Sequence, residues 1–343
     1  MAYPTLPLAV YEDYARVKQI DDSQESVSDV RHVTDMLRRA SVRVEQFTHR
    51  RFHPSYQTRR LNVPSIYADL NNRLLFRDDL WLDEDLLSPV RVQITSNVAN
   101  ATGDTLQANI TAKTSYLTVL DADGLDSGGD TRFSVGDILL VDDEVMIVAS
   151  VDTVNNYVYV RRGQLDTPTV SHTSSAIVYK YTTQTLNAGT DYVLLDYNVY
   201  PKYGLRLAYP NTWMGNYYSQ TWGIPTILVT GIWGYHRNVD EGWVNSLDTL
   251  QAGIDDSTQT LTVLDADGTD LNQRTRFEVN RLIRVDDEYM LITAIDTDTN
   301  ELTVLRGVNG TFAVAHDSST EIDVWYPVDD IVDATLSIAK MLY

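Results

Sequence analysis

An eight-residue stretch of this chain occurs twice, and this repetition constrains the fold more than any other feature. The sequence LTVLDADG at 117–124 returns letter for letter at 261–268, and later residues continue to match at the same offset. The further matched pairs are RF at 132 and 276, VDDE at 141 and 285, RG at 162 and 306, and His172 with His316. A constant offset over this length indicates that a whole folding unit was duplicated. Two separated copies do not form a solenoid, whose repeats stack directly on their neighbours, so we expect two distinct modules.

Each copy is expected to fold as a small all-β unit. Short runs rich in β-branched and aromatic residues occur in the first copy at 116–120, 138–142, 145–151, 157–160 and 176–179. Asp, Asn and Gly separate these runs, a pattern typical of a small barrel or sandwich. The first module is assigned to residues 111–181 and the second to residues 250–326.

The remaining segments carry a different pattern, with helices at both ends of the chain. Apolar periodicity predicts helices over 8–20 and 26–50 and a closing helix over 330–343. Strand-like runs lie between them, at 58–63, 73–76, 90–94, 186–195, 204–207 and 226–235. The acidic stretch at 83–85 is expected in a solvated turn.

The segments 1–110, 182–249 and 327–343 together make a coherent small framework once the modules are set aside. We therefore predict an α+β fold, in which a helical and β core domain is interrupted by two homologous all-β insertion modules. Such insertions are tolerated at loops, where extra length disturbs the host domain least.

Charge and composition exclude several classes of protein. The apolar fraction of 43% belongs to a folded chain, and no run approaches the roughly 20 apolar residues that span a bilayer. The formal net charge of −21 argues against a general nucleic-acid binder, whose affinity depends on Lys and Arg. Yet residues 28–60 hold eight arginines against three acidic residues. These arginines indicate either an external partner or pairing with acidic residues of the same assembly, and pairing is the simpler interpretation.

The motifs of common enzymes do not occur in the sequence. Gly-x-Ser-x-Gly, a Walker loop, His-Glu-x-x-His and the Rossmann glycines are all missing. The matched pair His172 and His316 is interpreted as a folding residue of each module. With no cysteine, disulfides and thiolate metal sites are excluded. We expect a protein that is not an enzyme and takes no cofactor.

Carboxylates cluster around a glycine in each repeated stretch. They are Asp121, Asp123 and Asp126 in the first copy and Asp265, Asp267 and Asp270 in the second. Calcium prefers such oxygen ligands, but an EF-hand loop has Gly at its sixth position and Glu at its twelfth. Here the glycine is fourth, and the twelfth position holds Arg132 or Arg276. A structural turn is therefore favoured, with calcium binding as the alternative.

Four framework segments, taken in order, carry a resemblance to a known family. They are ASVRVEQFTHRRFHP (40–54), DYVLL (191–195), VTGIWGY (229–235) and DATLSIAK (333–340). These segments resemble the head–tail adaptor (connector) family of tailed bacteriophages. The modules separately resemble a β-unit common in phage structural proteins, with a VDDExM hairpin and an RGxxGTxxxxH tail. The second copy fits this tail, whereas the first has Asp166 at the position of its second glycine.

The resemblance implies a virion protein that forms a ring, usually of twelve copies, beneath the portal protein. Such a ring extends the DNA channel and binds the next neck component, a stopper or tail terminator. It is assembled in the host cytoplasm and has no membrane partner. Genomic DNA would pass through the lumen without sequence-specific binding, which suits acidic subunits because like charges repel.

The resemblance and the charge pattern together suggest interface residues toward the portal or the adjacent subunit. They are Arg38, Arg39, Arg43, Arg50, Arg51, Trp233, Tyr235, Lys340 and Tyr343. Two other readings stay open. The chain could be a tail or capsid-surface protein whose modules decorate the particle or bind carbohydrate, or it could carry calcium-stabilised adhesion modules.

Overall fold

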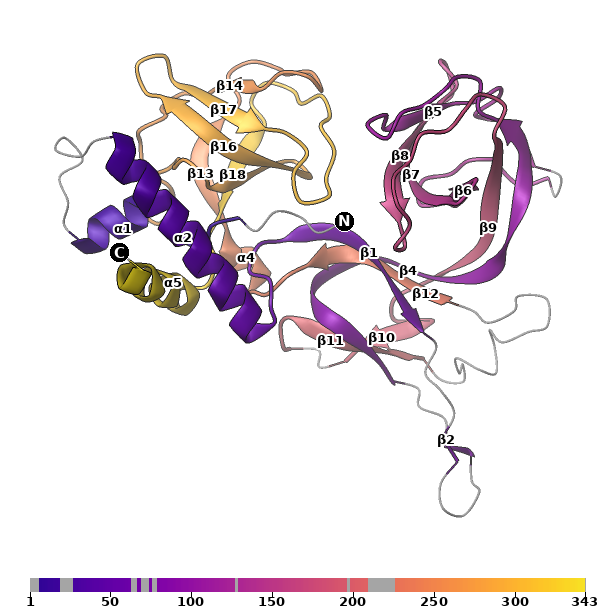
Figure 1. Cartoon of the computed structure of the whole chain (residues 1–343), viewed down its shortest axis with the longest axis horizontal. Coiled ribbons are helices and arrows are strands. Elements are labelled where there is room, and N and C mark those ends of the chain that lie inside the picture. The colour runs from indigo at the N-terminus through magenta and orange to yellow at the C-terminus, as the bar shows by residue number, and fades with distance from the viewer. Residues whose placement is uncertain are drawn as a thin grey trace.

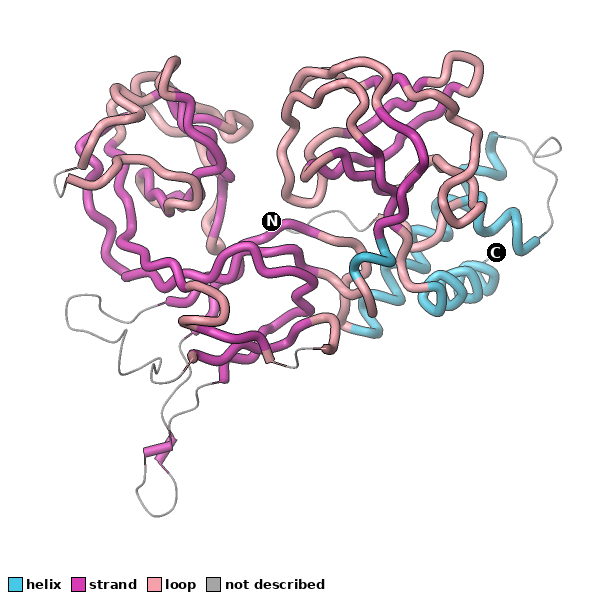
Figure 2. Tube along the Cα trace, turned by 180° about the vertical axis from the view of Figure 1, so that it is seen from behind, coloured by secondary structure: helices cyan, strands magenta, loops and turns pink. Residues whose placement is uncertain are grey.

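The computed structural model describes residues 6–18, 27–62, 67–68, 74–75, 79–126, 129–195, 198–208 and 226–342. The chain is mostly β, with two large antiparallel sheets and a group of helices at one side (Figure 1). This composition is compatible with the α+β class expected from the sequence. Viewed from behind, the helices again lie together, beside one of the two rounded β units (Figure 2). None of the described helices is long and apolar enough to cross a bilayer.

In the described part of the chain, the helices correspond to the three predicted ones plus one short turn of helix. They are α1 (Tyr11–Lys18), α2 (Val27–Thr48), α4 (Val239–Gly242) and α5 (Asp329–Leu342). Val33 and Leu37 of α2 pack against Leu336 and Ala339 of α5, so the two ends of the chain share one hydrophobic cluster. This is the packing that the apolar stripe of α2 requires.

The apolar periodicity that predicts this helix also places Phe47 on its buried face, after Val30, Val33, Leu37, Ala40 and Val44. In the structure Phe47 is 88% exposed. The helix ends at Thr48, and His49 adopts a left-handed conformation with φ 54° that reverses the chain. Phe52 then occupies the buried place beside Leu8 and Val44. The apolar periodicity of the helix therefore does not extend to Phe47, because the turn at His49 brings Phe52 into the core instead.

The larger sheet joins the framework to the first module. Its strand order is β1-β12-β4-β9-β6-β7-β8-β5, with β11 pairing to β4 and β10 to β11. The strands are β1 (Ser55–Asn62), β4 (Asp79–Thr105), β5 (Tyr116–Thr118), β6 (Ile138–Val141), β7 (Glu144–Asp152), β8 (Tyr157–Gln164), β9 (Ile177–Leu186), β10 (Tyr192–Leu194), β11 (Lys202–Leu207) and β12 (Thr226–Trp233). A separate two-stranded ribbon pairs β2 (Tyr67–Ala68) with β3 (Leu74–Leu75).

The smaller sheet belongs to the second module, in the order β13-β18-β15-β16-β17-β14. Its strands are β13 (Trp243–Thr249), β14 (Thr260–Thr262), β15 (Leu282–Val285), β16 (Glu288–Asp296), β17 (Glu301–Leu305) and β18 (Glu321–Trp325). This order repeats the β4-β9-β6-β7-β8-β5 part of the larger sheet. Leu117 pairs with Val158, and Leu261 pairs with Leu302 in the same register. The duplicated sequence therefore gives a duplicated sheet.

The structural equivalence begins earlier than the predicted start of the first module at residue 111. The pair Ala99 with Tyr181 in the first module corresponds to Trp243 with Trp325 in the second. Each module also has its own hydrophobic cluster, which contains Leu117 and Phe133 in the first and Leu261 and Phe277 in the second.

Strand β4 differs most from the sequence-based expectation. It is a single strand of 27 residues, whereas the prediction placed a short strand at 90–94 and a solvated acidic turn at 83–85. Its first half pairs with β11 and β12 in the framework, and its second half pairs with β9 up to the first module. The prediction of a turn at 83–85 was wrong, because these acidic residues continue β4 and pair with arginines of the same chain.

Both glycines of the VTGIWGY segment lie where the backbone of a neighbouring residue leaves no room for a side chain. A Cβ atom at Gly231 would lie 2.4 Å from the carbonyl oxygen of Ser88, and one at Gly234 would lie 2.7 Å from that of His53. Such distances exclude any side chain. The segment forms β12, which lies between β1 and β4 at the centre of the framework.

Candidate functional site

A buried network of charged groups fixes the tail of each module to its hairpin. In the first module, Glu144 accepts two hydrogen bonds from Arg162, both at 2.7 Å, and lies 2.9 Å from Nε2 of His172. The other ring nitrogen of His172 lies 2.7 Å from Asp142. The second module repeats each contact with Glu288, Arg306, His316 and Asp286. We call these groups the carboxylate–arginine–histidine networks.

The two networks hold their carboxylates in the ionised form. Burial by itself would raise the pKa of Glu144, but hydrogen bonds from Arg162, from the backbone of Val170 and from His172 outweigh it and lower that pKa to about 2. The same balance lowers the pKa of Glu288. A carboxylate that is ionised and fully hydrogen-bonded is not available as an acid or base. The networks therefore stabilise the modules, the role expected for His172 and His316.

The repeated Asp-Ala-Asp-Gly turns contain an arginine where a cation would be expected. Arg132 donates to the carbonyl oxygen of Asp121 at 3.1 Å and to the buried carboxylate of Asp104 at 3.2 Å. Arg276 makes the equivalent contacts with Asp265 and Asp248, at 2.7 and 2.9 Å. Each guanidinium supplies the positive charge at its turn. The carboxylates of Asp104 and Asp121, and of Asp248 and Asp265, therefore form ion pairs with an arginine of the protein.

Of the other calcium candidates, Asp123 and Asp267 are exposed, and the remaining two serve backbone geometry. Asp126 and Asp270 accept backbone N–H groups of their own loops, those of Asp130 and Arg274. Within the ranges that the structure describes, no group of three or more histidine or acidic residues is arranged to hold a metal ion.

Asp104 and Asp248 were not predicted from the sequence, although each of the two turns is held by hydrogen bonds to one of these residues. Each is almost fully buried and accepts the two backbone N–H groups that open the turn, those of Leu120 and Asp121 in the first module. The signal was present, because the string DTLQA begins at both residue 104 and residue 248. It lies upstream of the longer repeat and outside the residues assigned to the first module.

Most of the arginines between 38 and 60 pair within the chain, as the simpler interpretation of the sequence expected. Arg50 lies 3.4 Å from Asp85, and Arg51 lies 3.7 Å from Glu84. Arg59 pairs with Asp83 and Glu84. The acidic residues of β4 thus neutralise three arginines of the loop after α2 and of β1. Arg38 and Arg39 both pair with Asp35 on the same helix, at 3.0 and 2.6 Å.

One face of α2 stays open to solvent. Arg39 is an exposed side chain despite its ion pair, Arg43 is exposed, and Phe47 is 88% exposed. These residues are four apart, so they lie along one face of the helix. Among the described residues, Arg43 has no ion-pair partner. We call Arg39, Arg43 and Phe47 the α2 stripe.

The remaining interface candidates divide into three cases. Trp233 is fully buried, and its indole N–H donates to the carbonyl oxygen of Gln57 at 3.1 Å, so its assignment to an interface was wrong. Tyr235 is partly buried, with Phe52 packed against its ring edge and the Arg50 guanidinium 4.3 Å from its ring centre. Lys340 is exposed on α5, and Tyr343 lies outside the described residues.

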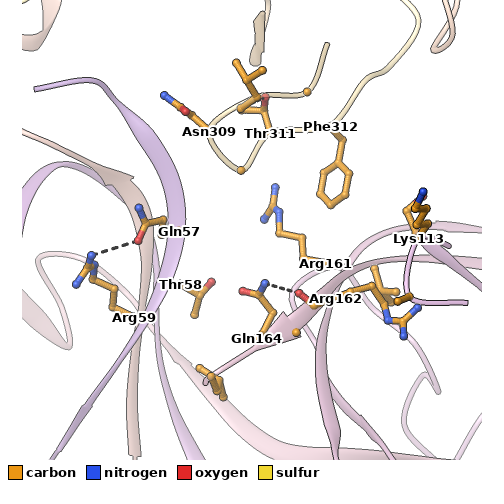
Figure 3. Close-up of a pocket in the computed structure, with 18 of the residues that line it drawn as sticks. Gln57, Thr58, Arg59, Lys113, Arg161, Arg162, Gln164, Asn309, Thr311 and Phe312 are labelled. Atoms are coloured by element: carbon orange, nitrogen blue, oxygen red, sulfur yellow. Dashed lines mark hydrogen bonds between the residues drawn. The ribbon is translucent and has the colours of Figure 1, made fainter. Parts of the chain in front are cut away.

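A large cavity lies between the two modules, next to β1. It has a volume of about 710 Å³ and is lined by residues of β1, of β8 and its following loop, and of the 305–312 loop in the second module. Figure 3 shows Arg161 at its centre, with Phe312 and Asn309 on one side and Gln57 and Thr58 on the other. The cavity thus joins three parts of the chain that are far apart in sequence.

A second charged junction attaches α1 to the second module. Buried Arg281 donates to Glu278 at 2.7 Å and to Asp13 of α1 at 2.8 Å. Burial raises the pKa of the nearby Glu12 to about 7, and the negative charges of Glu278 and Asp13 add to this rise. Burial also raises the pKa of Glu278. Three carboxyl groups thus surround one buried guanidinium.

Comparison of this chain with protein-family models, curated proteins and solved structures gave no match.

Proposed function

We propose that this protein is a head–tail adaptor of a tailed bacteriophage, forming a ring of about twelve copies beneath the portal. In this proposal it joins the capsid to a neck or tail protein, lets the genome pass through its lumen, and catalyses no reaction. The observation that carries the proposal is the α2 stripe, a basic and apolar surface on a protein of net charge −21. A ring requires each copy to present one surface that fits a different surface on its neighbour.

The arrangement of the modules supports their origin as insertions into an adaptor framework. The strands at the base of each module pair with each other, β4 with β9 and β13 with β18. The chain therefore leaves the framework and returns at nearly the same place, which is the geometry that insertion requires. After the second module, α5 returns to pack on α2, so residues before and after both modules share one core.

The composition of the described surface suits a channel protein. Acidic residues of β4 pair with framework arginines. The modules at 111–181 and 250–326 hold 25 acidic against 10 basic residues, so they carry −15 of the net charge of −21. A lumen lined by such subunits would repel a DNA phosphate backbone, so that the genome slides instead of adhering.

The direct test of the proposal is the mass of the assembly, measured by light scattering on the purified protein with and without portal protein. The proposal expects a ring-sized assembly, formed alone or on the portal. A protein that remains monomeric in both conditions would overturn it.

Charge reversal on α2 should abolish this assembly. We expect the Arg38→Glu, Arg39→Glu and Arg43→Glu triple variant to remain folded, because all three side chains are exposed, yet to lose association with the portal or with its own copies. Arg206→Glu is the control, since Arg206 is another half-exposed arginine but lies on the framework sheet. Normal assembly of the triple variant would contradict the role of the α2 stripe.

One observation favours the alternative of a surface protein that binds carbohydrate. Trp81 and Tyr203 stack in parallel on the framework sheet, 6.2 Å apart, and both rings are partly open to solvent. Flat exposed aromatic rings offer apolar faces that a sugar ring could cover. In this case Trp81→Ala should abolish binding to a glycan array, whereas an adaptor would show no glycan binding in either form.

A further inference from the structure

The cavity between the modules holds an arginine whose charge no described residue neutralises. Arg161 in the second half of β8 has no ion-pair partner among the described residues, and its Nε atom is buried without a hydrogen-bond acceptor. Its guanidinium carbon lies 3.9 Å from the ring centre of Tyr56 and 4.8 Å from that of Phe312. The two rings come from β1 and from the second module, so three parts of the chain fix the orientation of this group.

The fold of a module does not require this arginine. The equivalent position in the second module is Leu305, one residue before Arg306, just as Arg161 precedes Arg162. That leucine is 51% exposed and lines the same cavity. An unpaired, partly buried cation normally costs stability unless something neutralises it. Since the second module folds with leucine at this position, the unpaired arginine in the first module indicates that a ligand neutralises its charge.

The surroundings of Arg161 specify an anionic ligand. On an acidic protein, this cavity is lined by more basic than acidic side chains, with Arg59, Arg60 and Lys113 near Arg161 and only Asp83 and Asp166 opposing them. Concave surfaces lined by one sign of charge concentrate ions of the opposite sign. The volume of about 710 Å³ also falls within the usual range of ligand sites, roughly 300–1,000 Å³.

We propose that this cavity binds a short acidic peptide segment, with a carboxylate against the Arg161 guanidinium. The planar guanidinium matches a carboxylate in two parallel hydrogen bonds, and the flanking rings hold it ready. The amides of Gln57 and Asn309 and the hydroxyl of Thr311 hydrogen-bond within the chain, which fixes the walls that a bound peptide would meet. Leu305 and Phe312 offer apolar contact for its side chains.

A nucleic acid fits these observations less well. It carries one charge for every nucleotide and needs a row of cations, whereas three of the six arginines and lysines that line the cavity, Arg59, Arg162 and Arg306, already pair with carboxylates of the chain. The remaining negative surface would repel a polyanion. The acidic segment could come from a second copy of this chain or from another protein, because both sources present the same chemistry.

The test measures binding of a fluorescein-labelled hexapeptide of aspartate and glutamate by anisotropy, with inorganic phosphate and a single-stranded oligonucleotide as competitors. We expect Arg161→Ala to weaken peptide binding at least about tenfold, since each charge-assisted hydrogen bond contributes at least that factor. Lys113→Gln, at an exposed side chain, should weaken binding by a smaller factor and without effect on folding. Arg206→Ala is the matched control and should bind like the original protein.

Three outcomes would overturn the proposal: no peptide binding, equal binding by Arg161→Ala, or displacement by the oligonucleotide but not by free acidic peptide. The source is distinguished by the mass of the protein alone. If the segment belongs to a second copy, Arg161→Ala lowers the self-association as well as peptide binding. If it belongs to another protein, only peptide binding falls. Neither result depends on portal association, so this inference and the adaptor proposal can fail separately.

Discussion

Arg162→Ala is expected to destabilise the first module by roughly 3–5 kcal/mol, because it leaves the buried carboxylate of Glu144 without its main counter-charge. The change also removes hydrogen bonds to the carbonyl oxygens of Thr111, Thr114 and Val170. Arg306→Ala should have the same effect on the second module, since its contacts are equivalent. Chemical denaturation followed by circular dichroism would measure both.

A double variant separates the charge effect from a loss of packing. Glu144→Gln keeps hydrogen-bond acceptor capacity but removes the charge, so Glu144→Gln with Arg162→Ala should be more stable than Arg162→Ala alone. Equal stability of the two would show that the buried charge is not the cause. In the original protein, the stabilisation from Glu144 is present above pH 4.5 and is lost as the pH falls toward 2, because folding lowers the pKa of this group.

The original protein is expected to lose stability as the pH rises to neutral and alkaline values, and Glu12→Gln is expected to abolish this loss. Folding raises the pKa of Glu12 from 4.5 to about 7, so its contribution is fully present below pH 4.5 and disappears as the pH rises through 7. The loss is on the order of 3 kcal/mol, since each unit of pKa corresponds to about 1.4 kcal/mol. The cause is the burial of three carboxyl groups around Arg281.

Hydrogen exchange of residues 11–18 at pH 5 and pH 8 would locate this effect in α1. In the original protein, the amides of α1 should be less protected at pH 8 than at pH 5, after correction for the intrinsic pH dependence of exchange. In Glu12→Gln, their protection should be equal at the two pH values. Glu241→Gln, at an exposed side chain of α4, is the control and should leave the pH dependence in place. A pH dependence that survives in Glu12→Gln would assign it to another group, such as Glu278.

The sequence pattern correctly predicted those parts of the fold that depend only on the packing of apolar side chains. The stripe of Val33, Leu37 and Ala40 predicted the buried face of α2, because a helix face packs against whatever apolar surface is available. The duplicated sequence likewise predicted two equivalent β units, since identical core residues such as Leu117 and Leu261 fill identical positions.

Most of the features that failed depend on distant partners. The acidic residues at 83–85 are typical of a solvated turn, yet Arg50, Arg51 and Arg59 neutralise them within strand β4. The family resemblance suggested Trp233 as an interface residue, but its side chain is fully buried and Gln57 on β1 accepts its indole hydrogen bond. No local pattern identifies Arg161, because Tyr56 and Phe312 are separated from it by about one hundred residues or more in each direction.

The length of β4 gives the two modules different mechanical properties. The first module and the framework share β4 and β9 without a break, so a tensile load on that module is carried by a row of backbone hydrogen bonds in shear. Rows loaded in shear must break together. The second module has its own sheet and meets the framework through side-chain packing, in a buried cluster that includes Leu87 and Trp325, and through ion pairs such as that of Arg281 with Asp13. Because no shared strand joins these two parts in the described sheets, we expect the second module to separate from the framework first under force, and the first module to act as the rigid arm.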